Sequence, residues 1–199
     1  MAEPRSLALH ATNILNDILR ESEALGIPSI DPMDGAVLMA EAFKAAASGG
    51  RLFLDLGAGV GYSTAWIALG AEMGCLKGDC IVKAVEIDPY RAERLERNMR
   101  RLGLNKVGVE VIRDEALRML LKLEPESVAM AFVDIEKNQY LDVLNLLRTR
   151  LKPGGTAIFH NAFFPEPPPE FFEAASQEPW RSSVIPTPAG LLVAILHRD

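Results

Sequence analysis

A glycine-rich turn, Asp55-Leu-Gly-Ala-Gly-Val-Gly-Tyr-Ser-Thr64, stands where a short apolar run gives way to a helical pattern. Its three glycines occupy alternate positions: Gly57, Gly59 and Gly61. Glycine has no side chain, so the backbone can approach a ligand closely at these points. Ser63 and Thr64 can cap the helix that follows or hold a carboxylate. The turn predicts a nucleoside-binding site, although it can also be read as a tight strand-to-helix connection and nothing more.

A single acid supports the nucleoside interpretation. Glu86 ends the next apolar run, 25 residues beyond Gly61, where a carboxylate can accept both hydroxyls of a ribose. The glycine spacing is G-x-G-x-G, with Tyr62 at the place where the dinucleotide pattern G-x-G-x-x-G has its last glycine. The sequence therefore favours S-adenosylmethionine over NAD as the cofactor.

Alternating strands and helices position these residues at one edge of a sheet. Apolar runs predict five strands, over 52–56, 81–85, 107–112, 128–133 and 156–159. Amphipathic windows predict intervening helices over 62–73, 89–103, 114–123 and 137–150, after two N-terminal helices over 7–25 and 33–47. The alternation indicates an α/β fold, a parallel sheet with helices on both faces. Ligands bind such sheets beyond the carboxyl ends of the strands.

The last 35 residues differ in composition, since they hold seven of the chain's 13 prolines. Proline resists strand ladders, so the segment is predicted to be mostly loop, ending in one strand over 191–196 that is reached through Gly190. Phe163, Phe164 and Trp180 either line an acceptor pocket or pack against the sheet edge or a dimer partner.

Composition indicates one globular domain. The chain has 199 residues, and 21 Lys+Arg against 27 Asp+Glu give a net charge of −6, which argues against nucleic acid as the main partner. No signal peptide and no apolar run of about 20 residues is visible, so we expect a cytoplasmic protein without membrane contact. Cys75 and Cys80 lack a second Cys/His pair for a metal tetrad and are interpreted as structural, with a local disulfide only in an unusual intracellular setting.

Nearly the whole chain, from Ile27 onward, resembles the class I S-adenosylmethionine-dependent methyltransferases, and within them the small cation-dependent O-methyltransferases of the catechol and caffeoyl-CoA type. The likeness rests on Asp55–Thr64, Glu86-Ile-Asp88, Asp134-Ile-Glu-Lys-Asn-Gln-Tyr140 and Leu151-Lys-Pro-Gly-Gly155. It implies a single-domain, Rossmann-like, doubly wound sheet of seven strands in the order 3-2-1-4-5-7-6, with strand 7 antiparallel. Residues 1–48 would form a lid or a dimer contact, and residues 49–199 would form the cofactor-binding core.

The resemblance also implies the site residues. The residues expected to bind S-adenosylmethionine are Asp55, Gly57, Gly59, Gly61, Tyr62, Ser63, Glu86, Asp114 and Asp134. Glu86 would hold the ribose, and Asp114 would face the adenine. Lys137 would be the general base, and Asp134 would also be a ligand of a divalent metal ion.

Asp134 and Lys137 lie three residues apart where strand becomes helix, so both side chains can point into one crevice. Methyl transfer from a sulfonium is an in-line displacement, and an acceptor hydroxyl must lose its proton. A neighbouring ammonium or a metal ion lowers the pKa of that hydroxyl, and a lysine can accept the proton. The alternative is that Asp134 caps the helix of residues 137–150 and that Lys137 is solvated.

One position departs from the family, because His160-Asn161 stands where the family normally has Asp-Asn. Magnesium prefers oxygen donors, whereas imidazole suits Zn, Ni, Fe or Cu. A metal site of Asp134, His160 and Asn161 therefore leaves three interpretations open. These are a changed metal preference, a weakened or lost metal with His160 as the catalytic base, and a site that is no longer catalytic.

Three functions follow from these observations. The first is S-adenosylmethionine-dependent O-methyl transfer to a small, aromatic acceptor, with a homodimer as in the family. The second is methylation of an RNA hydroxyl, for which the arginines between Arg91 and Arg101 offer the one basic surface. The third is a protein that binds S-adenosylmethionine without catalysis, and His160 is the residue that supports it best.

Overall fold

Seven strands and seven α-helices make up the computed structural model, which describes residues 4–198 and the side chains of residues 8–198. The strands are β1 Leu52–Leu56, β2 Cys80–Val85, β3 Val107–Ile112, β4 Val128–Val133, β5 Leu151–His160, β6 Trp180–Ile185 and β7 Leu191–Leu196. The helices are α1 Pro4–Ala24, α2 Pro32–Ala47, α3 Tyr62–Gly74, α4 Pro89–Arg101, α5 Ala116–Leu121, α6 Tyr140–Arg150 and α7 Pro169–Ala175, with a 3-10 turn, η1 Lys137–Gln139, before α6.

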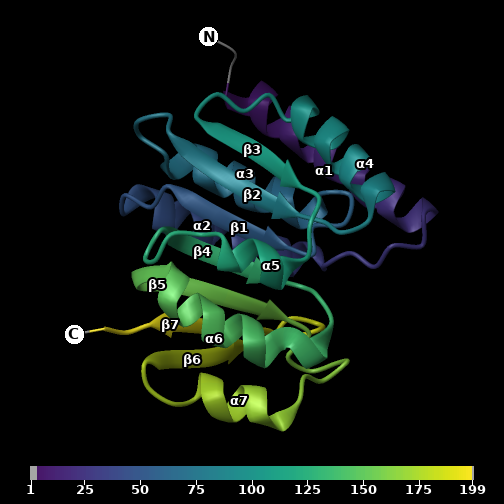
Figure 1. Cartoon of the computed structure of the whole chain (residues 1–199). Helices are drawn as coiled ribbons and strands as arrows, with labels where there is room; N and C mark the ends of the chain where they lie inside the picture. Colours follow the sequence, from purple (N-terminus) through teal and green to yellow (C-terminus); the bar gives the residue numbers. More distant parts are fainter. Residues whose placement is uncertain (1–3, 199) are drawn as a thin grey trace.

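The strands form one sheet in the order β3-β2-β1-β4-β5-β7-β6 (Figure 1), which confirms the predicted order. Strands β1 to β5 are parallel, and β7 runs antiparallel to both β5 and β6. The chain moves from β1 outward to β3 and then returns to β4 on the other side of β1. The strand order therefore reverses between β1 and β4, the place where open α/β sheets bind ligands. Leu56 pairs with Val133 there, so Gly57 and Asp134 follow them at the same level.

Helices cover both faces of the sheet, as predicted. Buried residues of α1 to α4 pack with Phe53 and Phe132 on one face. Buried residues of α5 to α7, the helices in front in Figure 1, pack with Leu54 and Val133 on the other. Adjacent strand residues belong to opposite faces because side chains alternate along a strand. β4 is buried at all six positions, as expected of a central strand covered on both sides.

The C-terminal segment is more regular than the predicted loop. It contains α7 and the edge strand β6 in addition to β7, and Trp180 is buried in the core against the α5–α7 layer. The prediction of loop was wrong because the prolines flank these elements: Pro169 is the first residue of α7, Pro179 precedes β6, and Pro186 follows it. Proline is tolerated at a first helical turn and outside a strand. Trp180 consequently does not line an acceptor pocket.

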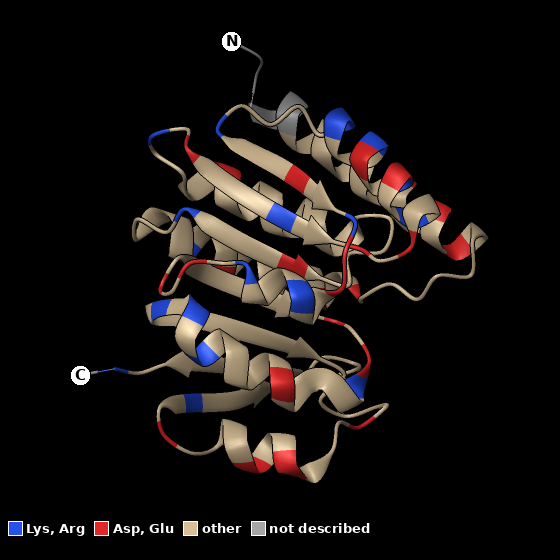
Figure 2. Ribbon diagram, in the orientation of Figure 1, with Lys and Arg blue, Asp and Glu red and all other residues tan. Residues whose placement is uncertain are grey.

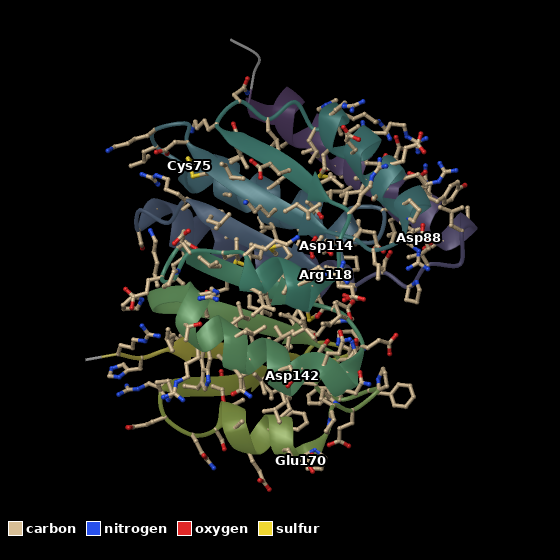
Figure 3. The ribbon with its side chains drawn as sticks, in the orientation of Figure 1. Cys75, Asp88, Asp114, Arg118, Asp142 and Glu170 are labelled. Carbon is tan, nitrogen blue, oxygen red and sulfur yellow. A yellow bond between two sulfur atoms is a disulfide. The ribbon has the colours of Figure 1, made fainter. Side chains whose placement is uncertain are left out.

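Cys75 and Cys80 are joined by a disulfide that ties the end of α3 to the start of β2. Both residues are buried, in agreement with a structural role. From the sequence, a disulfide between these residues is expected only in an unusual intracellular setting. The structure contains the disulfide. The pair lies at the end of the sheet opposite to Asp114 (Figure 3).

The arginines of α4 are largely paired with carboxylates. Arg97 and Arg101 form ion pairs with Glu21 and Asp17 of α1. Arg100 forms another within α4. Figure 2 shows the resulting mixture of positive and negative side chains along α1 and α4. Because these arginines are paired with carboxylates, they are less available to bind RNA phosphates, and the surface gives little support to the RNA hypothesis.

The N-terminal helices form part of the same layered structure. α2 packs along α3, and α1 contacts α3 and α4. No helix within residues 4–198 is long and apolar enough to cross a membrane. A role of residues 1–48 as a lid or as a dimer contact stays a prediction.

Candidate functional site

A cavity of about 460 Å³ opens at the carboxyl ends of β1, β2 and β4. Four predicted cofactor-binding residues besides Gly57 line it: Gly59, Glu86, Asp114 and Asp134. The loop between α1 and α2 closes one side with Ile27 and Pro28. Cofactor-sized ligands occupy pockets of roughly 300–1,000 Å³, so the cavity has room for a nucleoside cofactor.

The glycine turn passes so close to its neighbours that it tolerates no side chain at two positions. Gly57 has φ +90°, and a Cβ there would lie 2.2 Å from the carbonyl oxygen of Asp134. Gly61 has φ +102°, and a Cβ would lie 2.6 Å from Leu95 Cδ1. Both positions are left-handed, a conformation that favours glycine. Packing against the Asp134 backbone thus requires glycine at position 57, and the left-handed backbone favours it at position 61, whether or not a ligand is bound.

Asp55 lies underneath the turn and holds it in place. Its Oδ2 accepts hydrogen bonds from Ser63 Oγ at 2.8 Å and from Thr64 Oγ1 at 2.5 Å. The carboxylate that the two hydroxyls hold in this structure belongs to the chain itself. Complete burial raises the pKa of Asp55 to about 7, although both hydroxyls lower it. Asp55 is predicted to bind the cofactor, but it does not line the cavity. It supports the glycine turn from below instead.

Glu86 joins the glycine turn to the start of α4. Its Oε2 accepts a hydrogen bond from Gly59 N at 2.8 Å, and its Oε1 accepts one from Asp88 N at 2.9 Å. The side chain is 5% exposed and lines the cavity. Two backbone donors therefore fix this carboxylate at the end of β2, where the sequence places a ribose acid.

Asp114 lies on the far wall of the cavity, beside Arg118 in Figure 3. Its carboxylate accepts a hydrogen bond from Lys122 Nζ at 2.7 Å and is 3.3 Å from Arg118 Nη1. The hydrogen bond with Lys122 is the main reason why the pKa of Asp114 is lowered. The acid is thereby held ionised at the cavity wall.

A smaller pocket of about 30 Å³ adjoins the main cavity at the glycine turn. Tyr62 and Ser63 line it, together with Asp134. Burial raises the pKa of the Tyr62 hydroxyl, and its ring meets Trp66 edge to face. The two pockets share Gly57, Gly59 and Asp134, so seven of the nine predicted cofactor residues, all but Asp55 and Gly61, surround one continuous crevice.

Lys137 is the first residue of η1, and the side chains of Asp134 and Tyr140 hold its ammonium group. Its Nζ donates to Asp134 Oδ1 and to Tyr140 Oη, each at 2.8 Å. Tyr140 is fully buried, and its hydroxyl lies 3.1 Å from the carbonyl oxygens of Val133 and His160. η1 has no side-chain cap, so the alternative in which Asp134 caps the helix and Lys137 is solvated does not describe this structure.

His160 lies between two carboxylates. Its Nδ1 is 3.1 Å from Asp134 Oδ2, and its Nε2 is 3.3 Å from Asp34 Oδ2. Burial lowers the pKa of His160, but the two acids outweigh this effect and raise it to about 9. Burial likewise raises the pKa of Asp34 and Asp134, but the imidazole makes both lower than usual. The ring and the two acids stabilise one another as ions.

Asn161 turns away from this group. It has φ +60°, and its Nδ2 donates to the carbonyl oxygen of Phe164 at 2.7 Å. Phe163 and Phe164 follow it and are 51% and 79% exposed. Both aromatic rings are therefore available to a ligand at the end of β5, unlike Trp180.

The sequence did not single out Asp34 or assign a role to Tyr140. Asp34 is 0% exposed and accepts from Asp31 N at 3.1 Å as part of the capping box of α2. Asp31 and Asp34, spaced three apart around a proline, are a recognisable start signal for a helix. Nothing in that signal indicates that the second acid also contacts His160.

A family model described as a methyltransferase domain matches residues 54–162, more than half of the 199 residues. The chain belongs to this methyltransferase family. The match covers the glycine turn, Glu86, Asp134 and His160. The chain is also similar to a Mycobacterium avium protein named "Putative O-methyltransferase", at 24% identity over 69% of this chain and 59% of that protein. The chain thus spans about three fifths of the length of such relatives.

Solved structures share the fold of this chain. A methyltransferase from Geobacter sulfurreducens matches with a TM-score of 0.79 and 17% identity, over 94% of this chain and 89% of that one. An O-methyltransferase from Bacillus cereus, in complex with SAH, matches with a TM-score of 0.74 and 21% identity, over 92% and 90%. An O-methyltransferase from Streptomyces achromogenes, in complex with SAM, matches with a TM-score of 0.75 and 20% identity, over 93% and 90%.

Proposed function

We propose that this methyltransferase transfers a methyl group from S-adenosylmethionine to a hydroxyl of a small, aromatic molecule. The observation that carries the proposal is Lys137, whose Nζ is held by Asp134 and Tyr140 at the strand switch point. The names and bound cofactors of the relatives from Bacillus cereus and Streptomyces achromogenes support the same reaction. A homodimer and a cytoplasmic location stay predictions.

The cavity supplies a place for each part of the cofactor. Glu86 and Asp114 both line the cavity; Glu86 would accept the ribose hydroxyls, and Asp114 would face the adenine. Ile87 is 65% exposed beside Glu86 and offers an apolar surface to the base. The smaller pocket, at Tyr62 and Ser63, would take the amino-acid end. The sulfonium methyl would then lie near Asp134 and Lys137.

Lys137 would act on the acceptor hydroxyl. Nζ acts in its neutral amine form: it accepts the hydroxyl proton, which leaves an oxyanion as the nucleophile and an ammonium on the protein. Asp134 Oδ1, at 2.8 Å, stabilises that ammonium, and the hydrogen bond to Tyr140 Oη orients the lysine side chain. The oxyanion displaces the methyl group from sulfur in line, and S-adenosylhomocysteine leaves. His160, with both ring nitrogens facing acids, would position Asp134 in this reaction.

Cofactor binding and methyl transfer are tested separately. Calorimetry with S-adenosylmethionine should show saturable binding to the wild type and to Lys137→Ala with similar affinity. Labelled methyl transfer to a catechol, followed by screening of other phenols, should be lost in Lys137→Ala. Lys77→Ala, a substitution on an exposed loop, is the matched control and should keep full activity.

Turnover that is unchanged in Lys137→Ala would remove this lysine from the mechanism. Tight cofactor binding without transfer to any phenol, and with transfer to cellular RNA, would replace the small-molecule acceptor by a nucleic acid. Absence of cofactor binding would contradict the proposed function as a whole.

A further inference from the structure

The residues that the family resemblance implies as metal ligands do not form a metal site in this chain. Asp134 uses one carboxylate oxygen for Lys137 Nζ and the other for His160 Nδ1. Asn161 directs its amide nitrogen to the carbonyl oxygen of Phe164. A divalent cation needs several free lone pairs that converge on one point. Both carboxylate oxygens of Asp134 are thus already engaged by basic side chains, and Asn161 is held toward the backbone of Phe164.

The imidazole ring separates the two acids beside it. Nδ1 of His160 faces Asp134, and Nε2 faces Asp34, so the carboxylates lie against opposite nitrogens of one rigid ring. Among residues 8–198, the donor atoms of these three side chains do not gather within 4.8 Å of one another. Metal–ligand distances are about 2.0–2.6 Å, so these three side chains do not converge on one ion.

Histidine coordinates a metal through the lone pair of a neutral ring nitrogen. Here each nitrogen faces a carboxylate oxygen, which accepts hydrogen bonds and donates none when ionised. Both nitrogens are therefore suited to carry hydrogen, and neither has a lone pair directed at an ion. His160 is only 7% exposed and lines neither pocket at the switch point.

The charges of the group are matched without a metal. Two acids, Asp34 and Asp134, lie against two basic side chains, His160 and, in the ammonium form that precedes and follows its action as a base, Lys137. The aspartate that the family normally has at position 160 would add a third acid and leave one basic side chain. A divalent cation would offset that excess of negative charge, whereas in this chain the imidazole already does so.

We infer that the His160 ring takes the place of the divalent cation, and that this methyltransferase binds no metal at Asp134 and Asn161 and needs none. That the folded chain binds no metal there does not depend on the proposed reaction. That the reaction needs no metal rests on the proposed function.

The test measures metal binding by the full chain with S-adenosylmethionine present. Mn²⁺ is followed by electron paramagnetic resonance, and Zn²⁺ by calorimetry. The wild type should show no saturable binding of either ion that depends on Asp134. His160→Asp should gain saturable Mn²⁺ binding and should melt at a higher temperature when Mn²⁺ is added. His10→Asp, which adds a carboxylate on the exposed face of α1, is the matched control and should gain neither.

Saturable binding of Mn²⁺ or Zn²⁺ to the wild type that is lost in Asp134→Asn would overturn the inference. A folded His160→Asp chain that gains no Mn²⁺ binding would overturn it too. If His160→Asp does not fold, His160→Asn carries the test, because its amide oxygen is also a hard donor. Once turnover is established, a chelator should leave the wild-type rate unchanged, and a fall in rate restored by a divalent ion would refute independence from metal.

Discussion

Asp34 and His160 are separated by 126 positions in the chain, and the Asp34 Oδ2 atom lies 3.3 Å from His160 Nε2. The contact joins the first turn of α2 to the end of β5. It connects the N-terminal helices to the switch point, beside the cavity. A buried ion pair of this kind responds to pH, since its partners must stay charged to remain stable.

The pair makes stability depend on pH in the alkaline range. His160 has its pKa raised from 6.5 to about 9 in the folded chain, so the folded state binds its proton more tightly than the unfolded state does. The stabilisation is complete below about pH 6.5 and is lost as the pH rises through 9, up to about 3 kcal/mol. Urea unfolding at pH 6, 7.5 and 9 measures it.

Asp34→Asn provides the comparison for that measurement. Asparagine keeps an oxygen for the Asp31 amide but removes the negative charge beside the ring. The free energy of unfolding of the variant should fall less steeply between pH 6.5 and 9 than that of the wild type. Equal slopes would show that Asp34 does not hold the proton on His160.

Gly57 and Gly49 offer a matched pair of substitutions to alanine. Their φ angles are +90° and +92°, so both alanines pay a similar backbone penalty of about 1 kcal/mol. A Cβ at position 49 meets nothing within 4 Å, whereas one at position 57 lies 2.2 Å from the Asp134 carbonyl. Gly57→Ala should therefore destabilise the fold by a larger amount and weaken cofactor binding, as urea unfolding and calorimetry can measure. Similar losses in both variants would contradict the close approach.

Glu86→Gln removes the charge at the ribose contact and also replaces one of the two oxygens that accept from Gly59 N and Asp88 N by an NH2 group. Hydrogen bonds to a charged group contribute about 1.5–3 kcal/mol, so the dissociation constant for S-adenosylmethionine should rise roughly 10- to 100-fold. Glu110→Gln is the control, because Glu110 is on β3 with 53% of its side chain exposed. Calorimetry measures the affinity of both variants for S-adenosylmethionine. If Glu86→Gln binds the cofactor as tightly as Glu110→Gln does, Glu86 is excluded from the cofactor site.

The sequence predicted the parts of the fold that depend on local pattern. β4 is a continuous apolar run buried on both faces, and its predicted bounds, 128–133, are those observed. β6 escaped prediction because only Trp180 in it is fully buried, so its pattern does not resemble a core strand. An edge strand is specified by its neighbour, and its own residues carry a weak signal.

The candidate site also contains some features that the sequence predicts and others that it does not. Glu86 and Lys137 follow strand ends, and their place at one edge of the sheet is set by topology. The contact between Asp34 and His160 depends on how α2 packs on the sheet, which no spacing along the chain reports. The sequence could therefore identify His160 as unusual, but it could not identify the acid that accounts for it.

Glu21 links α1 to α4 and should make the protein sensitive to acid. Burial raises the pKa of Glu21, but hydrogen bonds from Asn98 and Arg97 and the charge of Arg94 outweigh it, so the pKa is lowered. The stabilisation is therefore present above about pH 4.5 and is lost as the pH falls below it. Glu21→Gln should cost about 1 kcal/mol at pH 7, and the difference from wild type should shrink on acidification.

The matched control is Glu23→Gln, on an exposed position of the same helix. Hydrogen exchange of α1 in the two variants locates the effect, since only loss of the Glu21 contacts should speed exchange there. The same helix leads into Ile27 and Pro28 at the cavity wall, so a loosened α1 should also weaken cofactor binding severalfold. Faster exchange with unchanged cofactor affinity would separate the packing of α1 from the shape of the cavity.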